Sequence, residues 1–137
     1  MANYFGSARS NYFKVKSETA FLAAMNEVPD IEVHTGKDGT VCVLVSGGDY
    51  GGWPTSTWNE DTDDIIEIDV PTIVSEHLAD DEVAIFMEAG AEKLRYIVGY
   101  AVAINSKGER EEVSLYDIYE LAAGLTDKPE NIIPAEY

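Results

Sequence analysis

Val83–Ile104 reads VAIFMEAGAEKLRYIVGYAVAI and is the stretch that decides the fold. It is rich in β-branched and aromatic residues, which favour extended backbone. Two strands are predicted, Val83–Ala89 and Leu94–Ile104, joined around Gly90–Lys93. Because parallel strands need a long crossover, so short a connection predicts an antiparallel hairpin.

The chain after this hairpin continues with short turns. A turn at Asn105–Gly108 leads to a strand that ends at Val113, which extends the hairpin into an antiparallel meander. Ser114 and Asp117 have the spacing of a helix capping box, with Asp in the position of the usual Glu. We therefore expect a helix from this point to Gly124.

The chain before the hairpin predicts strands and a helix in the order β-α-β-β. Alternating residues in Asn11–Lys16 favour a first strand, and apolar residues at helical spacing in Glu18–Asn26 favour a helix. Ile31–Thr35 and Thr40–Ser46 are predicted strands around a turn at Gly36–Gly39.

The middle of the chain is less regular. Gly47–Trp58 has four glycines, a proline and three aromatic residues, which predicts a long loop. Asn59–Asp64 extends this loop as an acidic run. Ile65–Asp69 suits a short strand, and Pro71 suits the start of a short helix through about Leu78.

These elements predict one α+β domain over residues 1–137. Its order is β-α-β-β-(loop)-α-β-β-β-α, with a mainly antiparallel sheet of about five or six strands and two or three helices. Residues 126–137 contain two prolines and are expected to be irregular.

The charge is the most informative feature of the composition. Nine Lys and Arg face 26 Asp and Glu, so the formal net charge is −17. About 2–8 units are enough to keep a small domain in solution. Such a charge repels nucleic acid and anionic membranes and steers the protein toward basic surfaces. We therefore expect a cationic protein partner and neither direct nucleic-acid binding nor membrane binding.

The sequence offers no clear site for catalysis, a metal or another cofactor. His34 and His77 lie near no nucleophile signature, which argues against a hydrolase. The glycines at Gly47–Gly52 lack the spacing and the basic residue of a phosphate loop. Asp61–Asp64 resembles a calcium loop but lacks its glycine and closing glutamate in register. We therefore predict a non-enzymatic protein without cofactors.

The expected location is the cytoplasm. The single cysteine, Cys42, lies in an apolar run where a buried, unreactive side chain is expected, so no disulfide framework is predicted. The N-terminal residues lack the apolar core of a signal peptide, and no apolar run has the length of a membrane span.

The acidic residues are concentrated in the middle of the chain. No Lys or Arg lies between Lys37 and Lys93, where fourteen acidic residues fall. We predict that part of this set forms an acidic face that binds the partner. The predicted binding carboxylates are Glu60, Asp61, Asp63, Asp64, Glu67, Asp69, Asp80, Asp81 and Glu82.

The spacing of these carboxylates suits the imitation of DNA. If the segment is extended, Asp61 and Asp63 project to one side roughly 6.5–7 Å apart, a repeat comparable with that of successive phosphates. The net charge of −17 equals that of roughly eight base pairs. Tyr50 and Trp58 flank the run and are predicted binding anchors, since such residues are enriched at interface centres. Trp53 suits either an exposed position or the core.

Four blocks of the chain resemble small acidic uncharacterised proteins of phages, plasmids and other mobile elements: Ser7–Phe13, Gly51–Pro54, Ala89–Tyr96 and Ser114–Tyr119. Together with the charge, the chain is similar in type to anti-restriction and anti-CRISPR inhibitors, several of which present carboxylates in place of DNA. The resemblance implies that the protein inhibits a host defence protein. It would do so by blocking the basic surface with which that defence protein binds DNA or an RNA-guided complex.

Two other classes of function stay open. The chain could be an acidic interaction or regulatory module of a mobile element without DNA mimicry. It could also be an enzyme whose site uses Tyr12, Arg9, Arg95 and a carboxylate such as Glu88. A contiguous acidic face would favour DNA mimicry, and acidic residues dispersed over the surface would favour an interaction module. A pocket with convergent polar groups would favour an enzyme. The sequence leaves homo-oligomerisation open.

Overall fold

The structure, a computed structural model of the 137-residue chain, describes residues 4–46, 51–93 and 95–135. The described residues form nine strands, three α-helices and two short 3-10 turns. The strands are β1 Phe5–Ser10, β2 Phe13–Lys14, β3 Ile31–Thr35, β4 Thr40–Val45, β5 Ser56–Asn59, β6 Asp64–Glu67, β7 Val83–Glu92, β8 Tyr96–Asn105 and β9 Arg110–Ser114. The helices are α1 Glu18–Asn26, α2 Val70–Ser75 and α3 Asp117–Ala123, and the 3-10 turns are η1 Lys37–Gly39 and η2 Pro129–Asn131.

Seven strands form one antiparallel sheet, and β5 and β6 form a separate hairpin. The sheet runs β3, β4, then β1 with β2, then β7, β8 and β9. The predicted α+β class and the mainly antiparallel sheet are confirmed. The predicted antiparallel pair is present, with register from Val83 opposite Asn105 to Glu92 opposite Tyr96. The predicted connection at Gly90–Lys93 is wrong, because β7 continues through Glu92 and the turn follows it.

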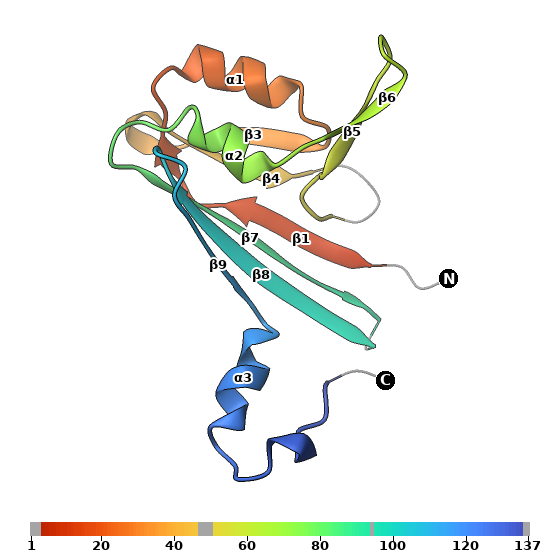
Figure 1. Ribbon diagram of the computed structural model, residues 1–137. Helices are drawn as coiled ribbons and strands as arrows, with labels where there is room; N and C mark the ends of the chain where they lie inside the picture. Colours follow the sequence, from red (N-terminus) through yellow and green to blue (C-terminus); the bar gives the residue numbers. More distant parts are fainter. Residues whose placement is uncertain (1–3, 47–50, 94, 136–137) are drawn as a thin grey trace.

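The helices α1 and α2 lie over one face of the sheet, and the core lies between them and the strands (Figure 1). Phe13 and Phe86 from the sheet, Phe21 from α1 and Val74 from α2 are each at most 1% exposed. Ser17 begins α1, as its side chain accepts a hydrogen bond from the Ala20 N–H. This arrangement leaves the opposite face of β1, β7, β8 and β9 without a covering helix among the described residues.

The predicted first strand, Asn11–Lys16, is wrong in position. The central strand is β1, which ends before Asn11. The Asn11 side chain donates a hydrogen bond to the Val83 carbonyl at 3.2 Å and accepts one from the Ile85 N–H at 2.8 Å. Only β2 remains of the predicted strand. The segment FGSARS was not predicted as a strand because it lacks β-branched residues, but its small residues suit close packing. At Gly90, a Cβ would lie 2.5 Å from the Phe5 carbonyl oxygen on the neighbouring strand.

Three further boundaries differ from the prediction. The predicted loop Gly47–Trp58 ends in strand β5, which is stabilised by pairing with β6 rather than by its own residues. Helix α2 ends at Ser75, and Leu78 instead bridges to Val15 of the sheet. The tail expected to be irregular contains the 3-10 turn η2.

Helix α3 projects beyond the end of the sheet (Figure 1). Only half of the predicted capping box is present, since the Ser114 N–H donates to Asp117 Oδ2 at 2.8 Å. Ser114 is not the N-cap, because α3 begins at Asp117 after Tyr116 and has no side-chain cap hydrogen bond. No residue of α3 is buried. None of the described helices has the length and apolar character needed to cross a membrane.

Candidate functional site

The hairpin formed by β5 and β6 carries four of the predicted binding carboxylates at its tip and rises away from the sheet (Figure 1). Glu60, Asp61, Asp63 and Asp64 are all exposed. None of the four forms an ion pair with a described residue. Their charges are therefore available to a cationic surface.

The tip is a tight turn, so the predicted extended spacing of Asp61 and Asp63 is wrong. Asn59 Oδ1 accepts hydrogen bonds from the N–H groups of Asp61 and Thr62 at 2.9 and 3.4 Å. Asp63 has a left-handed backbone conformation, with φ +57°. A side-chain amide that bonds backbone two residues ahead closes turns of this kind. The structure thus gathers the carboxylates at one point instead of spacing them along a line.

An apolar pair lies on the same hairpin. Trp58 and Ile65 occupy directly opposite positions of β5 and β6, so their side chains share one face. They are 54% and 69% exposed. The hairpin therefore combines an acidic tip with an exposed aromatic side chain, as the prediction for Trp58 requires. The second predicted anchor, Tyr50, lies outside the described residues.

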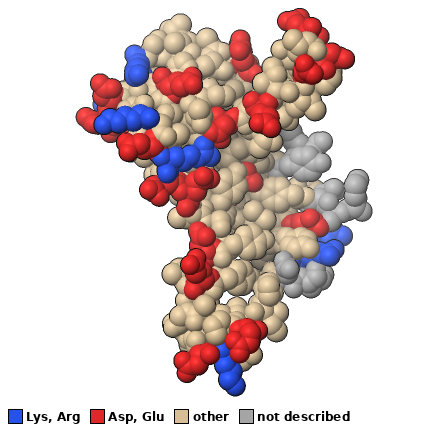
Figure 2. Space-filling model, in the orientation of Figure 1, with Lys and Arg blue, Asp and Glu red and all other residues tan. Residues whose placement is uncertain are grey.

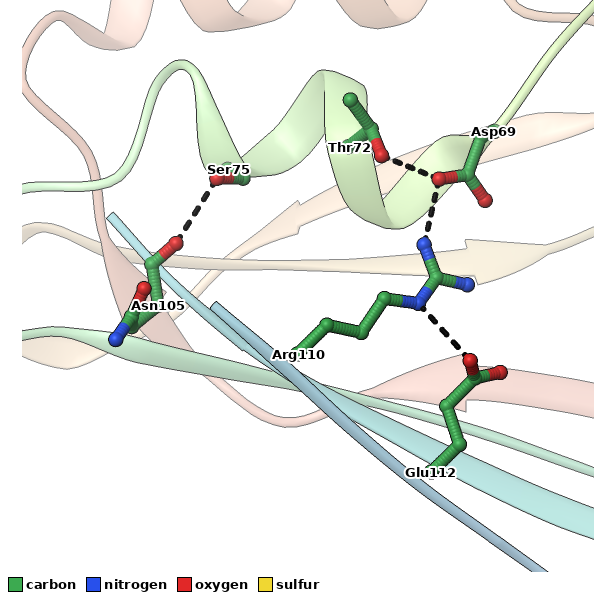
Figure 3. Close-up of polar contacts among 6 residues, drawn as sticks. All are labelled: Asp69, Thr72, Ser75, Asn105, Arg110 and Glu112. Carbon is green, nitrogen blue, oxygen red and sulfur yellow. Dashed lines mark hydrogen bonds and ion pairs between the residues drawn. The ribbon is translucent and has the colours of Figure 1, made fainter. Parts of the chain in front are cut away.

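Asp69 serves the fold rather than a free acidic face. Its carboxylate, which precedes α2, accepts a hydrogen bond from Thr72 and pairs with Arg110 Nη1 at 2.6 Å (Figure 3). Arg110 also lies 3.4 Å from Glu112, and Ser75 donates to the Asn105 carbonyl nearby. These contacts hold α2 against the β8–β9 turn.

The electrostatics agree with this role for Asp69. Partial burial acts to raise the pKa of its carboxyl group, but hydrogen bonds from Arg110 and Thr72 outweigh burial and hold the pKa below the usual value of 3.8. Asp69, which was predicted as part of the acidic binding face, is therefore paired within the fold. Glu67, two residues earlier in β6, is exposed.

Replacing Arg110 with Gln is expected to lower the free energy of unfolding at pH 7 by less than about 1 kcal/mol, because the ion pair is half-exposed. Since the pKa of Asp69 is lowered in the folded state, its contribution is present above pH 3.8 and is lost as pH falls through the folded pKa. The difference between parent and variant in urea unfolding should therefore shrink as the pH falls below 3.8. Lys107→Gln removes the same charge without breaking an ion pair of the described structure, and an equal loss in that control would contradict the assignment.

The remaining predicted carboxylates lie elsewhere. Asp80, Asp81 and Glu82 follow α2, whereas the hairpin precedes it, and Figure 1 shows the two regions at opposite ends of that helix. Glu82 Oε1 accepts a hydrogen bond from the Lys14 N–H at 2.6 Å. The nine predicted carboxylates therefore do not form one surface.

Acidic side chains form several separate groups in the view of Figure 2. One group covers the hairpin, others mix with Lys and Arg around the helical layer, and more lie toward α3, with uncharged surface between them. Among the described residues, no group of three or more His, Cys, Asp and Glu is arranged to hold a metal ion.

Glu88 is a structural anchor that sequence analysis proposed only as a catalytic group. Its carboxylate accepts hydrogen bonds from Tyr4 OH, the Trp53 backbone N–H and Tyr100 OH at 3.0, 2.9 and 3.0 Å. Burial and the adjacent carboxylate raise the pKa of Tyr4 to about 12 and also raise that of Tyr100. At Gly52 a Cβ would lie 2.9 Å from this carboxylate, so the glycine permits the approach.

Of the residues of the enzyme alternative, the structure brings Arg9 and Tyr12 together but separates Arg9 from Glu88. Arg9 pairs in register with Met87, and successive strand residues point to opposite faces, so Arg9 and Glu88 project from opposite sides of the sheet. Arg95 stacks on Tyr96 in the β7–β8 turn region. Trp53 packs against Phe86 with ring centroids 5.3 Å apart, which places it with the core.

The uncovered face of the sheet contains a shallow apolar groove of about 610 Å³ that sequence analysis missed. One row across five strands consists of Leu44, Arg9, Met87, Ala101 and Val113. The adjacent row is formed by small residues, Ser7, Ala89 and Gly99, and these leave the hollow. Alternation in the sequence indicates two faces, but it does not say which one the helices cover.

Arg9 is the cation of this groove. Its guanidinium lies 5.9 Å from the Tyr12 ring centroid and 3.9 Å from Cys42 Sγ, and its Nε donates to the Ser10 carbonyl at 3.0 Å. It forms no ion pair within the described part of the chain. In a protein of net charge −17, an unpaired guanidinium beside an apolar groove is a candidate binding group for a carboxylate.

Comparisons of the chain with protein-family models, with curated proteins and with solved structures found no match.

Proposed function

We propose that this protein is a non-enzymatic inhibitor that docks the β5–β6 hairpin on the basic, nucleic-acid-binding surface of a host defence protein. The observation that carries the proposal is the tip of this hairpin, where Glu60, Asp61, Asp63 and Asp64 are exposed and lack ion pairs with described residues. The surfaces that bind DNA in restriction enzymes and in RNA-guided complexes are rich in Lys and Arg.

The charges of the tip suit this role energetically. Exposed carboxylates remain hydrated until the partner arrives, and their field accelerates encounter with a basic channel. Inside such a channel they would replace the phosphates of the nucleic acid, and Trp58 would add an apolar contact. The proposed DNA mimic is therefore the short acidic tip of the β5–β6 hairpin, which a narrow channel can accept, and not an extended acidic face.

A set of matched charge variants tests the proposal. The hairpin variant carries E60Q, D61N, D63N and D64N, and the control carries E27Q, D30N, D38N and E76Q at other exposed positions. Both remove four negative charges. We expect the hairpin variant to bind a restriction enzyme or a CRISPR effector about 10²-fold more weakly than the parent, and the control to change affinity by less than about threefold.

Competition with DNA supplies the second measurement. We expect target DNA to displace the parent protein, and its affinity to fall as salt rises from about 0.1 to 1 M, because the Debye length shortens from about 10 to 3 Å. If the hairpin variant inhibits as well as the parent, or if DNA and the protein bind the partner together, the proposal is wrong.

An interaction module without mimicry is the second candidate, and the separate acidic groups in Figure 2 favour it. If this function is correct, DNA should not compete with the protein for its partner. It also predicts that the control charge variant loses as much affinity as the hairpin variant, since both lower the overall field equally.

Replacing Trp58 with Ala is expected to raise the dissociation rate from the partner by about 10-fold or more, because aromatic anchors at interface centres each contribute about 2 kcal/mol or more. The association rate should change little, since the charge is unaltered. Surface plasmon resonance separates the two rates. With Trp58 54% exposed, the free energy of unfolding should stay within about 0.5 kcal/mol of the parent value. An unchanged dissociation rate would remove Trp58 from the interface.

A further inference from the structure

The C-terminal arm, defined as residues 116–133, exposes apolar side chains that its own fold does not cover. The exposed fractions of its large apolar residues are 57% for Ile118, 70% for Leu121, 89% for Leu125 and 82% for Ile133. Helix α3 has seven residues, none of them buried. Because isolated helices shorter than about 12–15 residues are marginal in water, α3 needs a surface to pack against.

The groove on the uncovered sheet face offers such a surface within the same molecule. Met87 and Val113, which line it, are 56% and 63% exposed. Leu115 lies at its edge, next to Gly99, and begins the segment that leads into α3. An apolar strip therefore continues from the groove into the arm, and both halves of a contact are present on one chain.

The arm is held away from the groove of its own chain. The Leu115 N–H donates to the Gly99 carbonyl at 2.8 Å, and the Ser114 N–H donates to Asp117. These bonds fix the turn between β9 and α3, which then runs beyond the end of the sheet (Figure 1). An arm that leaves its own domain in this way can pack on a second copy.

Charge complementarity also favours a second copy. Arg9 lies in the groove without an ion pair in the described structure, and the arm carries Asp117, Glu120, Asp127 and Glu130 beside its apolar residues. A guanidinium at the edge of an apolar contact binds a carboxylate through charged hydrogen bonds. The arm therefore matches the groove in both its apolar and its charged parts.

We infer that the chain forms a two-fold symmetric dimer in which the C-terminal arm of each copy packs in the sheet-face groove of the other. Such a dimer contains the contact twice, because each copy supplies one groove and one arm. Fifteen residues line the groove, and the arm adds its own contacts. Each copy therefore approaches the roughly 20–30 residues of a standard interface.

The β9 edge of the sheet is a poorer route to association. The edge strand β9 carries Glu111 and Glu112, so pairing two copies of it would bring like charges together. The whole dimer must also overcome the repulsion between two chains of charge −17. Since salt screens this repulsion but leaves apolar contacts in place, dimerisation should strengthen with salt. The docking of the hairpin on a basic partner has the opposite dependence, which separates the two proposals.

Sedimentation velocity tests the dimer with the purified full chain alone. At about 100 μM protein we expect a dimer at about 1 M NaCl and partial dissociation at about 0.05 M. Leu121→Glu in the arm and Met87→Glu in the groove should each weaken dimerisation at least about tenfold. Ile65→Glu is the control, since Ile65 is 69% exposed, Leu121 is 70% exposed, and both changes add one charge. Thermal unfolding should show that all three variants stay folded.

Mixing the arm variant with the groove variant tests the arrangement itself. A mixed dimer keeps one unaltered arm in one unaltered groove, so the mixture should dimerise more strongly than either variant alone. The inference is wrong if the parent is monomeric at high salt, if Ile65→Glu weakens dimerisation equally, or if the mixture gains nothing. None of these results depends on inhibition of a host protein, so failure here leaves the hairpin proposal standing.

Discussion

Replacing Phe86 with Ala is expected to lower the free energy of unfolding by about 3–5 kcal/mol. Phe86 is 0% exposed in the centre of β7 and contacts the Trp53 ring edge-on, with 77° between the ring planes. Its removal leaves a cavity between the sheet and the Trp53 segment. Because small domains have about 5–15 kcal/mol of stability in total, the variant should be largely unfolded at elevated temperature.

Urea unfolding followed by circular dichroism measures this loss. Phe5→Ala is the matched control in the adjacent strand, since Phe5 is 65% exposed, and it should change stability by less than about 0.5 kcal/mol. If the two variants lose equal stability, the core does not lie where the structure places it. Indole fluorescence should also shift in the Phe86 variant, because Trp53 loses its buried contact.

Replacing Glu88 with Ala is expected to cost about 2–4 kcal/mol, because three donors that meet on its carboxylate lose their acceptor. The Trp53 backbone N–H and the Tyr100 hydroxyl are partly buried, and they would lose this hydrogen-bond acceptor. Glu88→Gln keeps an acceptor oxygen but removes the charge, so its cost should be smaller. A cost below about 0.5 kcal/mol for the Ala variant would show that the network does not hold the Trp53 segment.

The same network predicts loss of stability at alkaline pH. The pKa of Tyr4 is raised in the folded protein from 10.0 to about 12, and that of Tyr100 is also raised. The folded state therefore holds protons that the unfolded state releases, so stability is complete below pH 10 and falls as pH rises toward 12. Phenol absorbance during titration should show two late-titrating tyrosines, which Glu88→Gln returns toward their usual range.

The strand pair β7 and β8 could be predicted from the sequence because its signal is local. Most residues of Val83–Ala89 and Tyr96–Ile104 favour extended backbone, and the connection is too short for a parallel crossover. The same holds for α1, whose first turn is capped by Ser17 and whose apolar residues recur at helical spacing. In these elements local preference and tertiary structure agree.

Strands β1 and β5 could not be predicted because their stability comes from their neighbours. Small and polar residues in FGSARS have little preference for extended backbone, yet β1 pairs with both β4 and β7. Gly51 and Gly52 signalled a loop, but the loop is held by the carboxylate of Glu88, 36 residues away from Gly52 in the chain (88 − 52). No local pattern reports a contact of that kind.

The sequence by itself determined the class of the fold, the acidic character and the exposure expected of Glu60–Asp64, because propensity and net charge are sums over residues and do not depend on their arrangement. Only the tertiary structure decided which charges are free. In it, Asp69 is paired with Arg110, Asp80–Glu82 lie away from the hairpin, and the acidic run forms a turn. Within the described part of the chain it also left one face of the sheet without a covering helix, since α1 and α2 bury only the other side of the seven strands.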